Sequence, residues 1–482
     1  MADGCSIDEQ KLDANLQLFK AEVHCFCRDG RFYVLDVAGM RVHDLSALEA
    51  RILLMTDDAV SALNSRSEKD SQIADAICDL QKQGMLNSSK LEYIPEFEKP
   101  DLAISNLMLN LSEECNLSCK YCLAQCGSYG NAGGKMSEKV ACDSIDFLVR
   151  ESRGEHLIIS FFGGEPLLNF ETIQTIIKHS RDMEISHDKK ICHHLTTNGT
   201  LFDDEIISFL KNNGCRVTVS IDGDRENHDK MRIFSDGRGS FDRICQWLPL
   251  MIDKYQENVQ LEGTLNSETR DFTGAAKFLQ QFGAGHIYIN HARGFVKEFR
   301  LDDVSLNFMK DAYSEFARFI LDDAIQNKAT INSAFSRYIS TLASGNRARG
   351  FCAASTNLLS VSREGKIYPC PGFVGLEDYA LGDIWQGIEP QKIAHLRETL
   401  ADVDHIPACR ACWARYLCAG GCIAESVAIN KSPWEPCSYS CDLNRHIAEL
   451  AIWIYAELVR RRPEFFLSLL PISKDLAKMI AF

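Results

Sequence analysis

The sequence predicts an α/β protein whose central unit is a partial (β/α)6 TIM-like barrel. Between about residues 103 and 292, apolar runs of strand length alternate with stretches of helical periodicity. Repeated strand–helix units imply a parallel sheet with right-handed crossovers. Because six units fall short of the eight of a complete TIM barrel, we expect a partial barrel with ligands at the carboxyl ends of its strands. The six strand candidates are residues 107–111, 157–162, 191–195, 217–221, 259–265 and 287–289.

Helical patterns justify the remaining elements of the barrel and of the segments after it. One barrel helix is expected to begin at Ser137 and another at Asp203. The barrel is assigned to residues 96–300, and residues 301–345 to a bridging helical segment in which Phe308, Tyr313 and Phe316 are spaced for packing. The cysteine-rich remainder, 346–482, contains an expected amphipathic helix over residues 447–458.

Residues 1–95 are expected to form a small separate unit. A strand is predicted over residues 32–36, and Ser46 is placed to cap a helix. A further helix, which ends at Gly84, carries apolar side chains at helical spacing: Ile73, Ile77 and Leu80. Strands followed by helices indicate a winged-helix-like module, and residues 96–100 look like a linker.

Charge and cysteine content exclude several classes of protein. With 52 basic and 67 acidic side chains the net charge is −15, which disfavours nucleic acid as a partner. The chain has no apolar run of transmembrane length and no secretion signal at its start, so we expect a cytoplasmic protein with no membrane partner. Twenty cysteines in such a chain indicate metal sites rather than disulfides.

The first cysteine cluster directly follows the first barrel strand. Cys115, Cys119 and Cys122 have the spacing C-x3-C-x2-C. Three thiolates on one loop can bind three irons of a [4Fe–4S] cube and leave the fourth iron open for a ligand. A zinc site or free buried thiols are the alternatives. Cys126, four residues on, is interpreted as a bystander.

This cluster, with Tyr121 before its third cysteine, resembles that of the radical S-adenosylmethionine (SAM) superfamily. Three further motifs at consecutive strand ends support the resemblance: Gly163-Gly164-Glu165-Pro166, Thr196-Thr197-Asn198-Gly199 and Ser220-Ile221-Asp222-Gly223. The resemblance implies that the open iron chelates SAM. It also implies that the resulting 5′-deoxyadenosyl radical abstracts a hydrogen atom from the substrate. Implied SAM contacts are Gly163, Gly164, Glu165 (to the ammonium), Asn198, Ser220 and Arg232 (to the carboxylate), with a surface position as the alternative for Arg232.

A second cysteine array lies near the C-terminus. It comprises Cys352, Cys370, Cys409, Cys412, Cys418, Cys422, Cys437 and Cys441. The pattern resembles the iron–sulfur SPASM domain of radical SAM peptide maturases, with a zinc ribbon as the alternative. The resemblance implies two auxiliary clusters and so three [4Fe–4S] clusters in all. One would be held by Cys409, Cys412, Cys418 and either Cys441, which we prefer, or Cys437. The other would be held by Cys352, Cys370 and Cys422.

Residues 353–369 contain no cysteine, so the second of these clusters is expected to have three protein ligands. A substrate thiolate is then expected at its open iron, unless Cys437 closes the site. The resemblance to maturases of ranthipeptides, and to that of quinohemoprotein amine dehydrogenase, implies a Cys thioether crosslink in a peptide. Formylglycine formation, carbon–carbon crosslinking and, from another class, a non-catalytic electron carrier are the alternatives.

The expected partners follow from the same resemblance. Similar maturases begin with a winged-helix peptide-recognition element, which adds a leader peptide to a sheet edge as a strand. The N-terminal unit is therefore expected to bind a peptide or small-protein substrate. The alternatives are a structural cap and a DNA-reading winged helix, and the weak basicity of this segment argues against DNA. An electron donor such as flavodoxin or ferredoxin is also expected. The residue that acts as general base is not assigned.

Overall fold

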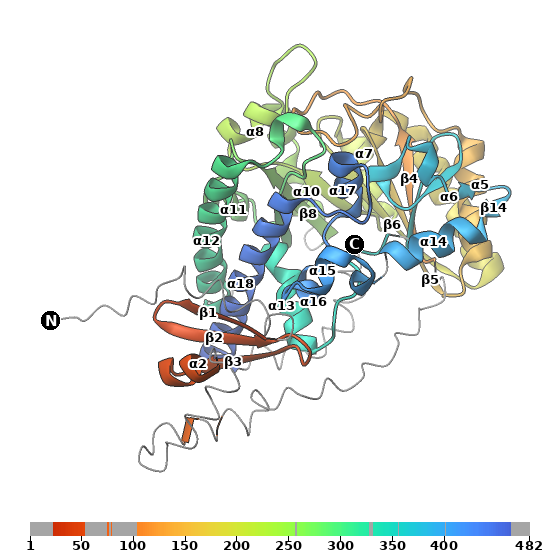
Figure 1. Ribbon diagram of the computed structural model, residues 1–482. Helices are drawn as coiled ribbons and strands as arrows, with labels where there is room; N and C mark the ends of the chain where they lie inside the picture. Colours follow the sequence, from red (N-terminus) through yellow and green to blue (C-terminus); the bar gives the residue numbers. More distant parts are fainter. Residues whose placement is uncertain are drawn as a thin grey trace.

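The computed structural model describes residues 23–53, 75, 76, 79, 104–255, 258–326, 331–354, 356–400 and 402–463. The described strands form two sheets, one of three strands and one of eleven. In Figure 1 the small sheet, in red, lies at the lower end of the long helix α18 (Ser438–Arg461), and the large sheet forms the body above it.

The small sheet is antiparallel, with the order β1 (Val23–Arg28), β2 (Arg31–Asp36) and β3 (Arg41–Leu45). β2 confirms the expected strand. Helix α2 (Ala47–Leu53) follows, and Ser46 caps it as expected, because Glu49 N donates to Ser46 Oγ at 3.2 Å and Ser46 N donates to Glu49 Oε2 at 2.8 Å. Ile73, Ile77, Leu80, Gly84 and the linker lie outside the described residues, so the winged-helix assignment stays a prediction.

The large sheet contains all six expected barrel strands as consecutive parallel neighbours. They are β4 (Asn106–Ser112), β5 (His156–Gly163), β6 (Lys190–Thr197), β7 (Arg216–Ser220), β8 (Val259–Leu265) and β9 (His286–His291). The strand order begins at β10 and ends at β14, so the barrel is open among the described strands, as predicted.

Two additions to this sheet were not expected. β10 (Ile331–Ser333) pairs parallel with β9, which makes the prediction of an entirely helical 301–345 segment wrong at this point. β11 (Leu358–Val361), from the cysteine-rich region, pairs parallel with β4. Beyond β11 the sheet continues antiparallel through β12 (Lys366–Tyr368), β13 (Gly382–Asp383) and β14 (Gly387–Ile388). The cysteine-rich region is therefore built onto the edge of the barrel.

Helices cover the outside of the barrel strands. They are α5 (Glu138–Glu151), α6 (Phe170–His187), α7 (Asp204–Asn212), α8 (Arg225–Met231), α9 (Phe241–Cys245), α10 (Leu248–Tyr255) and α11 (Phe272–Gln280). The helices expected to begin at Ser137 and Asp203 are present, and these two residues cap them: Val140 N donates to Ser137 Oγ at 3.2 Å, and Ile206 N donates to Asp203 Oδ1 at 2.8 Å. Each satisfies an amide in the first turn that has no partner within the helix.

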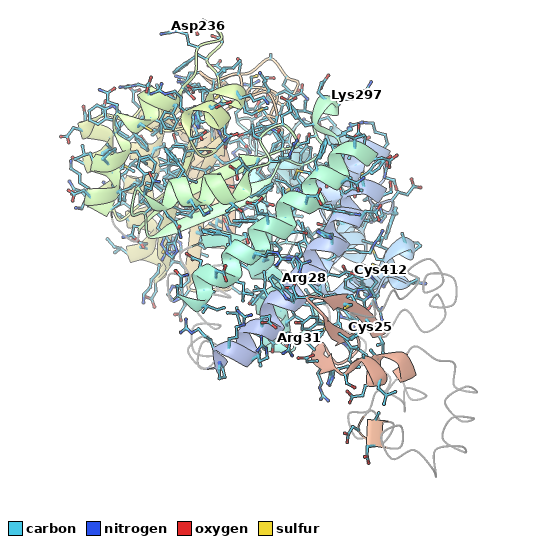
Figure 2. All side chains as sticks on the ribbon, turned by 90° about the vertical axis from the view of Figure 1, so that its left-hand side faces the viewer. Cys25, Arg28, Arg31, Asp236, Lys297 and Cys412 are labelled. Carbon is cyan, nitrogen blue, oxygen red and sulfur yellow. The ribbon has the colours of Figure 1, made fainter. Side chains whose placement is uncertain are left out.

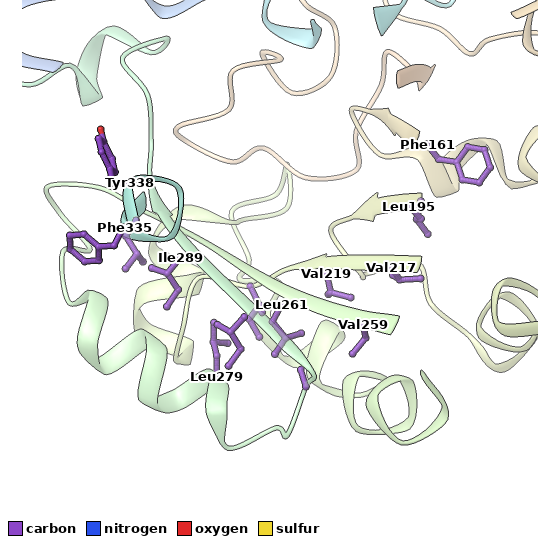
Figure 3. Close-up of a cluster of buried hydrophobic side chains, with 14 of the residues drawn as sticks. Phe161, Leu195, Val217, Val219, Val259, Leu261, Leu279, Ile289, Phe335 and Tyr338 are labelled. Atoms are coloured by element: carbon purple, nitrogen blue, oxygen red, sulfur yellow. The ribbon is translucent and has the colours of Figure 1, made fainter. Parts of the chain in front are cut away.

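Apolar and polar side chains alternate along the strands, and this alternation separates the hydrophobic core from the barrel interior. On β8, Val259, Leu261 and Leu265 are fully buried, while the positions that alternate with this face are polar: Gln260, Glu262 and Thr264. Figure 3 shows the buried side of this pattern, with Val259, Leu261 and Ile289 close to Leu279 of α11. The apolar side chains thus fill the layer between sheet and helices, and the polar ones face the other side of the sheet.

Long helices join the two sheets. The bridging segment forms α12 (Asp303–Ile325) and α13 (Ala334–Ser344), and the expected tail helix is part of α18. α18 packs against both. Between the bridging segment and α18 lie α14 (Pro390–Leu400), α15 (Pro407–Arg410), α16 (Arg415–Cys418) and α17 (Ile423–Asn430). Short 3-10 helices cover Pro166–Asn169, Lys297–Phe299, Pro371–Phe373, Glu377–Tyr379 and Val403–His405. None of the helices in the described ranges has the length and apolarity needed to span a membrane.

Candidate functional site

The loop after β4 lies against the end of β5 through glycine backbone. Gly164 N donates to Ser112 O at 2.7 Å, and Glu165 N donates to Glu114 O at 2.9 Å. A Cβ on Gly164 would lie 2.3 Å from Glu114 O, and one on Gly163, whose φ is +126°, would lie 2.4 Å from Ser112 O. Both glycines are therefore required for the close approach of the chain's own cysteine loop.

This loop carries the first three cysteines, and a second segment holds it from the other side. Ser118 N donates to Ile233 O at 2.7 Å, and Lys120 N donates to Met231 O at 3.0 Å. Cys115, Cys119 and Cys122 are half-buried. Burial raises the pKa of Cys115 and of Cys119 to about 12, and neighbouring thiols of the loop contribute to both shifts. Burial also raises the pKa of Cys122, so the surroundings of all three thiols favour the neutral form unless a cation binds them.

The arrangement fits the donor set of an iron–sulfur cube. Within the described part of the chain, no three His, Cys, Asp or Glu side chains lie close enough to share a single metal ion. Thiolates on different irons of a cube need not approach so closely. Cys126 is exposed and follows on the same loop.

Glu165 is fully buried, and the chain itself satisfies its carboxylate. Oε1 accepts from Leu167 N at 2.9 Å and from Thr197 Oγ1 at 2.8 Å, and Oε2 accepts from Asn198 N at 2.8 Å. Burial raises the pKa of Glu165 to about 7. In the structure this side chain ties the end of β5 to the end of β6, and its contact with the SAM ammonium stays a prediction.

Asn198 connects the end of β6 to the cysteine loop. Its Nδ2 donates to Asn116 Oδ1 at 2.9 Å and lies 3.7 Å from Cys115 Sγ. Its Oδ1 accepts from Thr200 N at 2.9 Å. Ser220 ends β7, where it pairs in register with Glu262. The structure thus brings Asn198 to the first cysteine and places Ser220 at the next strand end.

Arg232 is buried, so the surface alternative is wrong. Its Nε donates to Asp222 Oδ1 at 3.0 Å, and its guanidinium lies 5.5 Å from the ring centroid of Tyr121. Asp222 is fully buried and also accepts from the Tyr121 hydroxyl and from Thr264 N. This ion pair fixes the aromatic residue between the second and third cysteines. Asp222 lies within the Ser220–Gly223 motif, but its role was not predicted.

The C-terminal cysteines form two sets, which we name by their size. In the three-cysteine set, Cys352 and Cys422 lie near Cys370, whose thiol pKa is raised by burial and then by these two neighbours. In the four-cysteine set (Cys409, Cys412, Cys418 and Cys441), burial raises the pKa of Cys441 to about 12, with contributions from the other three thiols.

Cys437 lies one turn before Cys441 at the start of α18. Its carbonyl accepts from Cys441 N at 2.9 Å. Its thiol lies near Tyr439, whose pKa is raised chiefly by Asp303 and to a smaller extent by Cys437. The structure therefore gathers Cys441 with the four-cysteine set. Cys412 lies on the side of the molecule that faces the small sheet (Figure 2), where the adjacent Trp413 stacks on His24 at 3.5 Å between ring centroids.

Sequence reasoning named Ser220 but missed Glu262 and Tyr288, which continue a row of polar side chains from it inside the barrel. Ser220, Glu262 and Tyr288 are paired in register on β7, β8 and β9. Burial raises the pKa of Glu262, and Arg232 opposes this shift. Burial also raises the pKa of Tyr288, which Glu262 raises further. Polar residues at alternate positions of β8 and β9 were the available signal.

Comparison with known proteins agrees with this geometry. Residues 109–267 match the family model of the Radical SAM superfamily. Over 333 residues, which are 64% of this chain and 68% of the relative, the chain is 24% identical to the radical SAM cyclopropyl synthase TigE of Paramaledivibacter caminithermalis. Over 338 residues, 66% of this chain and 88% of the relative, it is 27% identical to a cysteine-type anaerobic sulfatase-maturating enzyme of Clostridium perfringens.

Solved structures share the fold. The structure of native anSMEcpe with bound AdoMet superposes with a TM-score of 0.63 at 22% identity, over 74% of this chain and 99% of that one. Streptococcus suis SuiB bound to its precursor peptide SuiA superposes with a TM-score of 0.51 at 13% identity, over 87% and 98% of the two chains. At these identities the likeness establishes a common fold. The part of the chain that matches the Radical SAM superfamily model is residues 109–267, which contain the first cysteine loop and the strand ends around it.

Proposed function

We propose that this protein is a radical SAM enzyme that modifies a peptide or small protein in the cytoplasm. The observation that carries the proposal is the loop of Cys115, Cys119 and Cys122, which is held against the strand ends by Glu165, Asn198 and the segment around Arg232. Relatives that mature sulfatases, and the SuiB structure with its precursor peptide, support a peptide substrate.

The residues of the first site have distinct roles in this proposal. The three thiolates hold a [4Fe–4S] cluster with one open iron, and Gly163, Gly164, Asn198, Ser220 and Arg232 surround the position of SAM. When bound, the cluster and SAM would together supply the chemistry for abstracting a hydrogen atom from an unactivated carbon. Asp222 holds Arg232 and Tyr121 in place. The row of Ser220, Glu262 and Tyr288 offers hydrogen-bonding groups to a substrate inside the barrel.

The two C-terminal sets hold two further [4Fe–4S] clusters in this proposal. Four thiols complete one, and Cys441 is preferred to Cys437 because it lies among them. Three thiols leave the other open to a substrate cysteine. The reaction is then a thioether crosslink: one hydrogen atom leaves the acceptor carbon, one proton and one electron leave the substrate thiol, and one carbon–sulfur bond forms. One of the clusters proposed for the C-terminal cysteine sets would accept this electron.

The small sheet is proposed to receive the leader segment of the substrate. β1 and β3 each have one neighbour among the described strands, so each offers an edge for a peptide strand. A flavodoxin or ferredoxin is the proposed electron donor. The net charge of −15 argues against a nucleic acid substrate.

Paired cysteine variants test the proposal. Anaerobically reduced protein with SAM is expected to release 5′-deoxyadenosine, and Cys119→Ala should abolish this release because it removes a ligand of the first site. Cys412→Ala should lower iron content and crosslinked product but leave part of the SAM cleavage. Wild-type protein that contains zinc in place of iron and sulfide would refute the proposal.

The relatives also favour a second reaction, formylglycine formation on a sulfatase. A cysteine-containing peptide distinguishes the two. A thioether product loses one free thiol and two hydrogen atoms and keeps its sulfur, whereas formylglycine loses the sulfur. Mass spectrometry after thiol alkylation separates these products.

A further inference from the structure

Two arginines converge on one aromatic ring beside the C-terminal cysteines. Arg293 follows β9, and Arg337 lies in α13. Their guanidinium carbons lie 5.2 Å and 4.7 Å from the ring centroid of Phe351, the residue before Cys352. Elements far apart in the sequence therefore bring two cations to the residue that precedes Cys352, the first cysteine of the three-cysteine set.

The charges of these arginines are only partly compensated. Glu425 Oε2 lies 3.9 Å from Arg293 Nη1, beyond hydrogen-bond distance, and Glu425 Oε1 accepts from Gly294 N at 2.7 Å. Arg337 Nη2 donates to the neutral carbonyl of Cys418 at 2.9 Å. Both Nη1 atoms are shielded from solvent and have no hydrogen-bond partner among the described residues. Two half-buried cations, each with a shielded Nη1 atom, thus face one carboxylate, which is costly unless further negative charge is nearby.

The cysteines supply candidates for that negative charge. Glu425, which lies 3.9 Å from Arg293, is three residues after Cys422 in the chain. Arg337 Nη2 donates to the carbonyl of Cys418. Phe351, whose ring both guanidinium groups approach, directly precedes Cys352. Since Cys418 belongs to the four-cysteine set and Cys352 and Cys422 to the three-cysteine set, the arginines lie between the two sets.

We propose that Arg293 and Arg337 are positioning cations that offset the negative charge of the clusters held by both C-terminal cysteine sets and so raise their reduction potentials. This inference rests on the proposed function, which places clusters there. Each cluster bound by thiolates becomes more negative when it accepts an electron. A nearby buried cation stabilises the reduced form more than the oxidised form, because the local dielectric is low.

Charge-removing and charge-keeping variants of the full chain test this inference. The variants are made in the Cys119→Ala background, so that the signal comes from the C-terminal sets alone. Reduction by dithionite is followed by spin resonance at controlled potential. Arg337→Gln and Arg293→Gln should make the reduction potential more negative by about 59 mV, which corresponds to a tenfold change in a one-electron equilibrium. Arg337→Lys should keep the wild-type potential.

Arg300 provides the matched control. Its Nε donates to Gly294 O at 3.0 Å, and its Nη2 donates to Ala428 O at 3.2 Å, so it joins the same segments through backbone contacts. Arg300→Gln should leave the potential unchanged. If Arg337→Gln loses iron, the reduction potentials of Arg293→Gln and Arg337→Lys still compare a variant that removes a charge with one that keeps it.

Measuring iron and sulfide first distinguishes failure of the proposed function from failure of the inference about the two arginines. If the Cys119→Ala protein contains no iron, the proposed clusters themselves are refuted. If its iron is present and the glutamine variants keep the parental potential, the inference alone is overturned. Weaker binding of an acidic peptide by the glutamine variants, with an unchanged potential, would likewise overturn it and assign the arginines to substrate carboxylates.

Discussion

At the scale of single residues, one buried ion pair determines the position of the first cysteine loop. Asp222 is fully buried and binds three donors from three segments: Tyr121 in the loop, Arg232 after α8 and Thr264 on β8. A buried pair gains little over apolar packing, but removing one partner leaves the other charge uncompensated. Its value here is that it fixes geometry around Cys119.

Asp222→Asn is expected to lower the free energy of unfolding by about 3–5 kcal/mol, because buried Arg232 loses its counter-charge. Urea-induced unfolding followed by circular dichroism measures this change. The matched control is Asp242→Asn, which breaks an exposed pair with Arg225 and should have little effect. Equal effects of the two substitutions would contradict the assigned role of Asp222.

At the scale of elements, close contact between backbones connects β4 and β5 at the site. In Gly164→Ala, the new Cβ would lie 2.3 Å from Glu114 O and 2.8 Å from Gly127 Cα, so the loop that carries Cys115 must shift. We expect reduced iron in the first site and reduced SAM cleavage with little change in helix content. Iron analysis in a background that lacks the C-terminal sets gives the direct measurement.

A second glycine shows whether the effect is local. A Cβ on Gly154 would have its nearest neighbour at 3.9 Å, so Gly154→Ala should keep full iron content. If both alanine variants bind iron as well as the wild type does, the tight contact at Gly164 is not required for the loop.

The sequence predicted those elements whose signals are local. The six barrel strands, the cap at Ser46 and the helix starts at Ser137 and Asp203 all depend on neighbouring residues. β10 and β11 were missed because each is short and pairs with a strand distant in the sequence. The contacts of Glu165 and Arg232 could not be predicted either, because their partners come from other strand ends.

At the scale of the whole molecule, α18 connects the small sheet to the cysteine sets. Its first turn carries Cys441, and its far end accepts the Tyr33 hydroxyl at Glu457 Oε1, 3.1 Å away. Arg28 of β1 lies 4.8 Å from the ring centroid of Trp453 (Figure 2 shows Arg28 at this junction). The small sheet therefore packs on α18, the helix that carries the proposed cluster ligand Cys441. A peptide bound to the small sheet would be connected to that ligand through this helix.

Trp413 is expected to be the most sensitive contact of this junction. It stacks on His24 with an interplanar angle of 2°, and it follows Cys412 directly. Trp413→Leu removes the stacking partner, so we expect faster amide exchange in β1 and β2 and weaker binding of a leader peptide. Hydrogen exchange read by mass spectrometry locates the change.

Trp385→Leu is the control for loss of an indole. Trp385 is 52% exposed and donates to Asp143 Oδ2 at 2.7 Å, away from the small sheet. It should leave exchange in β1 and β2 unchanged. If Trp413→Leu also leaves exchange there unchanged, the other contacts of the small sheet hold it in place, among them Tyr33 with Glu457, Arg28 with Trp453 and His24 with Glu449. The stacked pair then does not couple the small sheet to the four-cysteine set. If exchange rises while α18 stays protected, the small sheet is a separable recognition unit whose attachment depends on the residue next to a proposed cluster ligand.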